Sequence, residues 1–156
     1  MKLLLDAHLG IYLIVIGSIF GDCTNLNEKV MTKQTGLMIL VAGPYRSGTG
    51  DDPEKMAQNV HVMEAYALPL FRAGHVPVLG EWFALPLVAL AGSQRVGDEP
   101  FNEIFHPIAE RLLAHCDAVL RVGGASQGAD LMVTIAQERG LQIFHQLRDV
   151  PGCATL

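Results

Sequence analysis

Two glycine-rich segments carry most of the side chains that could perform chemistry. The first, residues 43–50, places Arg46 among the hydroxyl groups of Tyr45, Ser47 and Thr49. Its glycine spacing is that of a phosphate-binding loop, but the lysine of a Walker-type loop is absent after the second glycine. We therefore do not expect a Walker-type NTPase. Arg46 and the hydroxyl groups could still hold a phosphate or a sugar; a plain glycine-rich connection is the alternative.

The second segment, residues 123–128, fits the G-x-S-x-G pattern of a nucleophile elbow with Ser126 at its centre. Only 28 residues follow Gly128 in the chain of 156, and they offer Asp130, Asp149 and His145 as triad partners. That is little room for the acid and histidine strands of an α/β-hydrolase. Serine hydrolysis through Ser126 is thus the third and least favoured reading.

The same segment has a second use, because the amides at a helix N-terminus bind anions. Ser126 and Gly128 would then cradle a phosphate or a sugar. Dinucleotide binding is poorly supported, since the segment lacks G-x-G-x-x-G and an acidic residue about 20 positions further on.

Other polar and aromatic residues indicate less. His61 with Glu64, and His106 with Glu110, share helix faces, but neither pair has a third ligand nearby in sequence. We expect surface or capping roles for them and no metal. The aromatic pair Trp82 and Phe83 could line a base-stacking pocket or belong to the core.

Apolar runs alternate with helical patterns from Met38 onward, which predicts right-handed βαβ units and a mostly parallel sheet with helices on both faces. Pro77 indicates an edge position for its strand. Ligands bind beyond the carboxyl ends of such strands, where both glycine segments lie. The expected strands are residues 38–42, 75–79, 117–122 and 141–145. The expected helices are residues 51–73 with a kink at Pro69, 103–115 and 129–139, with 81–91 as a short helix or a lid.

Composition narrows the class of protein. A hydrophobic content of 50% with 17% charged residues excludes a disordered chain, and the length suits one domain. The net charge of −5 argues against a broad nucleic-acid-binding face. The three cysteines, Cys23, Cys116 and Cys153, form no CxxC pair. Neither a disulfide framework nor a zinc ribbon is expected, and the cytoplasm is the expected compartment.

The first 37 residues differ from the rest. The uncharged stretch 8–21 is too short to span a bilayer, so no membrane association is expected. Three interpretations stay open: translation starting at Met31 or Met38, an extra packed helix or strand, or a signal or anchor. We therefore expect an N-terminal extension over 1–37, one α/β domain over 38–150 and a tail over 151–156.

With these residues in view, the chain from Met38 to His145 resembles the nucleoside 2-deoxyribosyltransferase-like superfamily, including its small uncharacterised relatives. The resemblance rests on the order and spacing of short motifs. They are Ile39–Tyr45, Asn59, Gly74–Val78, Cys116–Leu120, Ser126–Ala129 and Ala136.

The resemblance implies a single flavodoxin-like, Rossmann-like domain with about five strands and no cofactor. It also implies a homodimer or larger assembly in which a neighbour completes each site. Members cleave the N-glycosidic bond of deoxynucleosides or nucleotides through a carboxylate on the helix after the Ser/Gly loop. A carboxylate suits this reaction, because the sugar C1′ develops oxocarbenium character that an anion stabilises and can trap as an ester.

This chain departs from the pattern at the nucleophile. The position of the family's glutamate is occupied by Met132, and the closest acid is Asp130. Two helical positions rotate a side chain by about 200°. Asp130 could enter the pocket from the first turn as the catalytic residue, or it could merely favour the helix start.

The expected ligand is therefore a nucleoside or nucleotide-like small molecule. Cleavage or transfer at its N-glycosidic bond is the first hypothesis, and a non-catalytic nucleotide-binding or sensing module is the alternative. With Asp130 as the catalytic residue, the expected binding residues are Gly43, Pro44, Tyr45, Arg46, Asn59, Glu81, Ser126 and Gly128.

Overall fold

The computed structural model describes residues 36–153, and these belong to one compact unit. The expectations for the extension over 1–37 fall almost entirely outside the described residues, as do those for 154–156. Gly36 and Leu37 are described, and the Leu37 carbonyl accepts a hydrogen bond from the Val76 amide at 2.8 Å. None of the helices between residues 36 and 153 has the length and apolar character needed to cross a membrane.

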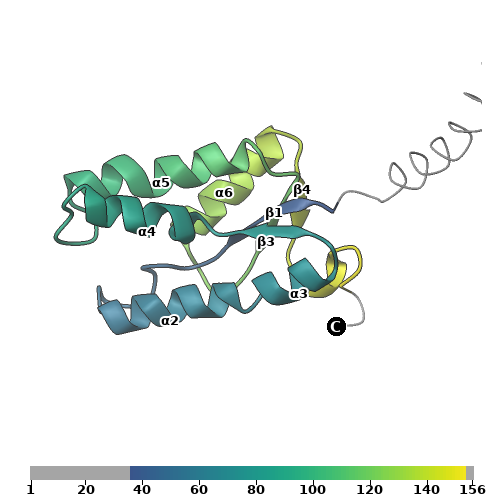
Figure 1. Cartoon of the computed structure of the whole chain (residues 1–156), viewed down its shortest axis with the longest axis horizontal. Helices are drawn as coiled ribbons and strands as arrows, with labels where there is room; N and C mark the ends of the chain where they lie inside the picture. The colour runs from purple at the N-terminus through teal and green to yellow at the C-terminus, as the bar shows by residue number, and fades with distance from the viewer. Residues whose placement is uncertain (1–35, 154–156) are drawn as a thin grey trace, which may run out of the picture. The chain divides into compact units, whose positions relative to one another are not determined.

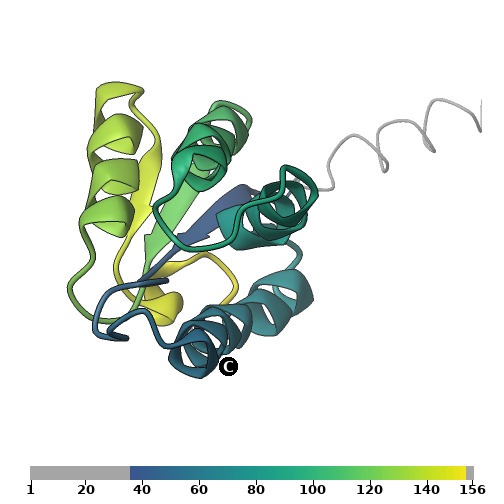
Figure 2. The same cartoon turned by 90° about the vertical axis from the view of Figure 1, so that its left-hand side faces the viewer.

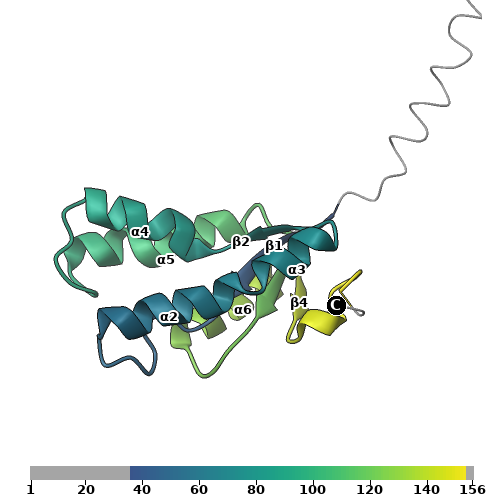
Figure 3. The ribbon, with the colours of Figure 1, turned by 60° about the horizontal axis from the view of Figure 1, so that its bottom comes forward.

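Four parallel strands form the sheet of the described residues, in the order β2-β1-β3-β4 (Figures 1 and 3). The central strands β1 (Met38–Ala42) and β3 (Ala118–Arg121) pair with Leu40 opposite Val119. All of β1 and the first three residues of β3 are apolar, because both faces of the sheet are covered. The edge strands β2 (Val76–Val78) and β4 (Gln142–Phe144) are shorter. The edge position predicted from Pro77 is confirmed.

Alternate residues of β1 serve two separate cores. Ile39 and Val41 pack with Met63 of α2 (Pro53–Glu64) and Leu70 of α3 (Ala67–Arg72). Leu40 and Ala42 face the other side, where α5 (Glu99–Leu113) and α6 (Gln127–Glu138) cover the sheet. Helix α4 (Gly80–Leu90) packs mainly against α5. Figure 2 shows the sheet between these two helical layers.

The segment 81–91, expected to be a short helix or a lid, forms helix α4. It approaches α5 closely at Gly80, where an added Cβ would lie 3.1 Å from the Cβ of Ala109. The small residues at this crossing let the two helices pack with little separation.

The single helix expected over 51–73 is two helices. The break falls at Ala65 and Tyr66 rather than at Pro69, which is the third residue of α3. Amides in the first turn of a helix have no intrahelical acceptor, so proline costs little there.

The expectation of about five strands is not met, because residues 36–153 contain four. After β4 the chain forms a 3₁₀ helix, η1 (Leu147–Asp149), and then buries Val150 and Cys153 in the core beside α3. The segment expected to be a tail from residue 151 thus contributes to the core as far as Cys153.

His75 connects both ends of the described chain. Its buried ring accepts a hydrogen bond from the Leu37 amide through Nδ1 at 3.0 Å and donates from Nε2 to the Pro151 carbonyl at 2.6 Å. This pairing requires the neutral ring with its proton on Nε2.

Candidate functional site

A cavity of about 310 Å³ lies beyond the carboxyl end of β1. Its walls come from the first glycine segment, the N-terminal ends of α4 and α6, and one face of α5. The two glycine segments meet beside it: a Cβ at Gly123, where φ is +73°, would lie 2.7 Å from Cδ of Pro44. The sheet edge predicted to bind a ligand therefore carries a cavity in the size range of small-molecule sites.

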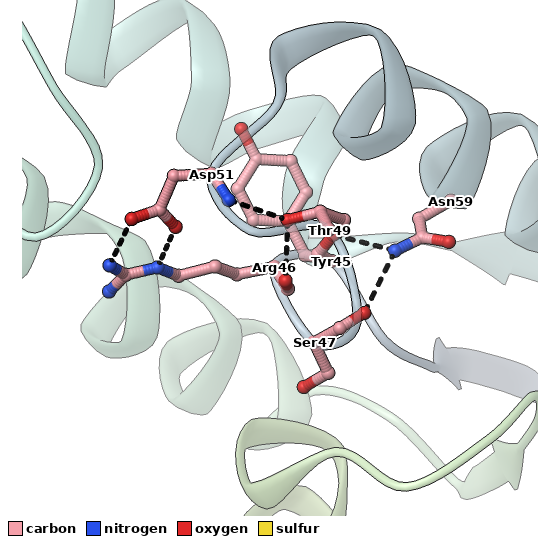
Figure 4. A network of polar contacts seen from close by, with 6 residues as sticks. All are labelled: Tyr45, Arg46, Ser47, Thr49, Asp51 and Asn59. Atoms are coloured by element: carbon pink, nitrogen blue, oxygen red, sulfur yellow. Dashed lines mark hydrogen bonds and ion pairs between the residues drawn. The ribbon is translucent and has the colours of Figure 1, made fainter.

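The first glycine segment is held in shape by its own polar groups (Figure 4). Arg46 forms a two-pronged ion pair with Asp51, with Nη2 and Oδ2 2.7 Å apart. Thr49 Oγ1 donates to the Arg46 carbonyl at 2.6 Å. Asn59 of α2 donates from Nδ2 to the Tyr45 carbonyl at 2.9 Å and more weakly to that of Ser47 at 3.4 Å. Asn59 thus supports the loop from behind and does not line the cavity.

The Arg46–Asp51 pair changes the electrostatics of the loop. Hydrogen bonding to Arg46 lowers the pKa of Asp51, although partial desolvation opposes this. The guanidinium charge at the cavity mouth is thereby largely balanced, so Arg46 contributes hydrogen-bond donors more than net positive charge.

Ser126 caps helix α6, and its buried Oγ accepts a hydrogen bond from the Ala129 amide at 3.3 Å. Gly128 packs closely against α5, and any larger residue there would clash, because a Cβ would lie 2.9 Å from Cε1 of His106. Both residues line the cavity, but Asp130, Asp149 and His145 do not. The serine-hydrolase interpretation therefore gains no support.

Asp130 does not line the cavity, whereas a catalytic role would require its side chain to enter it. Its side chain is 64% exposed and accepts a hydrogen bond from Nε of Arg121 at 2.9 Å. Arg121 also donates to the carbonyls of Val122 and Gly124. The reason is helical geometry: Met132 faces the cavity, so a residue two positions earlier points away from it. Asp130 steadies the second segment through Arg121.

Glu81 is the only residue with a carboxylate among the described residues that line the cavity. It occupies the first turn of α4, where the helix dipole favours negative charge. Burial nevertheless dominates and raises the pKa of Glu81 to about 7, against a smaller opposing effect of its backbone hydrogen bond. The pKa of Tyr45 is also raised, first by burial and then by the charge on Glu81. Glu81 can thus exchange a proton near neutral pH.

An aromatic wall, defined here as Tyr45, Phe101 and Phe105, lines the cavity; Tyr45 was predicted from the sequence, and the two phenylalanines were missed. Phe101 and Phe105 stack with ring centroids 4.5 Å apart, and Tyr45 lies 4.8 Å from Phe105. The i, i+4 spacing of the two phenylalanines was the available signal. Trp82 and Phe83, the expected candidates for base stacking or the core, are half-exposed and do not line the cavity.

Neither a known protein-family model nor a curated protein sequence matches the chain.

The cavity brings together six of the predicted site residues and leaves three outside. Pro44, Asn59 and Asp130 do not line it, and His106, expected on a helix surface, does. Met132, at the position that the resemblance marks for the nucleophile, is buried in the cavity wall. The predicted residues that line the cavity are Gly43, Tyr45, Arg46, Glu81, Ser126 and Gly128.

Proposed function

We propose that this protein binds a nucleoside or nucleotide in the cavity and cleaves or transfers at its N-glycosidic bond, with Glu81 as the reacting carboxylate. The position of Glu81 supports the proposal most strongly: its carboxylate is partly buried, its pKa is raised to about 7, and no other carboxylate lies among the described lining residues of the cavity. Perturbed carboxylates in clefts are typical of functional sites.

The chemistry follows from the ionised form of Glu81. As the bond from C1′ to the base nitrogen breaks, its electron pair leaves with the base and positive charge develops at C1′. The carboxylate stabilises that charge or bonds to C1′ as an ester, which water or a second base then displaces. Tyr45 and Arg46 orient the sugar or phosphate, and Ser126 with Gly128 receives a phosphate at the start of α6.

The fold supports the same proposal at a coarser level. The strand order 2-1-3-4 is that of the first four strands of a flavodoxin-like sheet. A cytoplasmic location is also part of the proposal, supported by the free thiols of Cys116 and Cys153.

A non-catalytic nucleotide-binding module is the second candidate. Met132 favours it, because a thioether stands where the resemblance expects the nucleophile. The balanced charge of Arg46 also suits binding without turnover.

Incubation with a panel of ribo- and deoxynucleosides and their 5′-monophosphates tests the function, with free base quantified by chromatography. We expect base release from at least one panel member. Thermal stabilisation by a panel member without any base release would favour the binding module. If no panel member releases free base and none stabilises the protein thermally, both candidate functions are overturned.

A further inference from the structure

We propose that the aromatic wall is a nucleobase-stacking subsite and that Phe105 determines the preference for base-bearing ligands. The inference deepens the proposed function and rests on it for the identity of the substrate. It assigns the base to the α5 side of the cavity and the sugar C1′ to the side of Glu81.

The wall is a continuous aromatic surface. Phe105 is its centre, since its ring centroid lies within 5 Å of those of both Phe101 and Tyr45, whose own centroids are 6.4 Å apart. Phe101 is buried and backs the wall, while Phe105 and Tyr45 are partly exposed. Two of the three rings thus remain accessible to a ligand.

Helix α5 holds this surface in a fixed position. Its N-cap Asp98 accepts hydrogen bonds from the amides of Gln94, Arg95 and Phe101 and from Ser93 Oγ. Partial desolvation acts to raise the pKa of Asp98, but these bonds outweigh it and lower the pKa to about 2. The cap therefore stays ionised at neutral pH, and the first turn that carries Phe101 is anchored.

Stacking on aromatic rings selects for a base because every nucleobase has a π-face and neither a sugar nor a phosphate has one. Tyr45 contacts Phe105, and it lines the same cavity as Glu81, whose charge raises the pKa of Tyr45. A base on the wall would thus place its glycosidic bond near Glu81. His106 meets Phe105 edge-on at 5.5 Å and ends the face with a group that can hydrogen-bond a base edge.

The test uses the full chain with Glu81→Gln, which removes turnover from the binding measurement. Calorimetry compares the four common 2′-deoxynucleosides and their 5′-monophosphates with 2-deoxyribose 5-phosphate, which lacks a base. Adding Phe105→Leu to the Glu81→Gln protein should weaken its affinity for the base-bearing probes about fivefold to 150-fold. Affinity for the base-free probe should change less than twofold.

Matched variants complete the test. Phe105→Tyr and Phe105→Trp should keep the affinity, and Phe71→Leu should not alter it, because Phe71 is exposed on α3 and does not line the cavity. If Phe105→Leu does not fold, Phe105→Met, which fills the space with a flexible side chain that has no aromatic face, should give the same selective loss.

An equal loss for both kinds of probe would overturn the inference, as would unchanged affinity, or no binding of any base-bearing probe. Selective binding in a protein whose wild type releases no base would keep the inference and reject the catalytic function.

Discussion

The raised pKa of Glu81 lowers the stability of the folded protein when this carboxyl group is ionised. Its carboxyl group ionises near 4.5 when free and near 7 in the folded chain. Between these pH values the unfolded chain loses the proton first, so raising the pH lowers the free energy of unfolding. This cost is the expected signature of a buried reacting group.

Replacing Glu81 by Gln should therefore stabilise the protein at pH 8, by about 3 kcal/mol, and leave it nearly unchanged near pH 4.5. Urea denaturation at the two pH values measures the difference. Glu103→Gln, at an exposed position of α5, is the control and should show no gain at pH 8. If Glu81→Gln is no more stable than wild type at pH 8, folding does not raise the pKa of Glu81.

Single residues were predicted from sequence where their neighbours in the chain decide their role. Tyr45 and Arg46 follow directly from the glycine spacing of their loop, and both line the cavity. Glu81 was predicted only as a binding residue, because its pKa depends on burial by segments distant in sequence. The sequence left two roles open for Asp130, and the structure places it outside the cavity lining, two helical positions from Met132, which faces the cavity.

Among the elements, the edge strand β2 follows directly after His75, whose ring bonds the first and last described segments of the chain. His75→Ala removes the acceptor for the Leu37 amide and the donor to the Pro151 carbonyl. We expect a loss of about 2 kcal/mol in the free energy of unfolding, because two backbone groups lose their partners. Hydrogen exchange at the Leu37 amide should accelerate more than exchange at the Val119 amide in β3.

His115→Ala provides the matched control, since His115 is exposed just after α5. An equal loss of stability in both variants would show that the connection made by His75 contributes nothing specific.

The elements themselves were largely predictable. Apolar runs placed all four strands within two residues of their ends. The signal is strongest at the central strand β1, which is covered on both faces and is apolar throughout. The start of α5 was predicted four residues too late, although Asp98 and the proline in the first turn mark it. The fifth strand came from the resemblance alone, and no apolar run after β4 supported it.

Within residues 36–153, helix α4 exposes an apolar stripe. Phe83, Leu87 and Leu90 share a helix face and are 44%, 43% and 84% exposed, and residues 82–92 contain no charged side chain. An uncharged apolar stripe suits a symmetric contact with an identical stripe. We therefore propose that the protein forms a homodimer or larger assembly through α4.

Leu90→Lys should accordingly shift the protein toward monomer in sedimentation velocity experiments. Leu131→Lys, which introduces the same charge at an exposed leucine of α6, should leave the assembly intact. A wild-type chain that sediments as a monomer at high concentration would contradict the proposal.

The role of Glu81 as the reacting carboxylate can be measured through kcat/KM for base release from the best substrate of the panel. Glu81→Gln should lower it at least about a hundredfold, and Asp130→Asn, the same change outside the cavity, should leave it within about threefold. Wild-type kcat/KM should fall as the pH drops below about 7, where Glu81 takes up its proton. Retained activity in Glu81→Gln, or a comparable loss in Asp130→Asn, would show that Glu81 is not the carboxylate that reacts with the substrate.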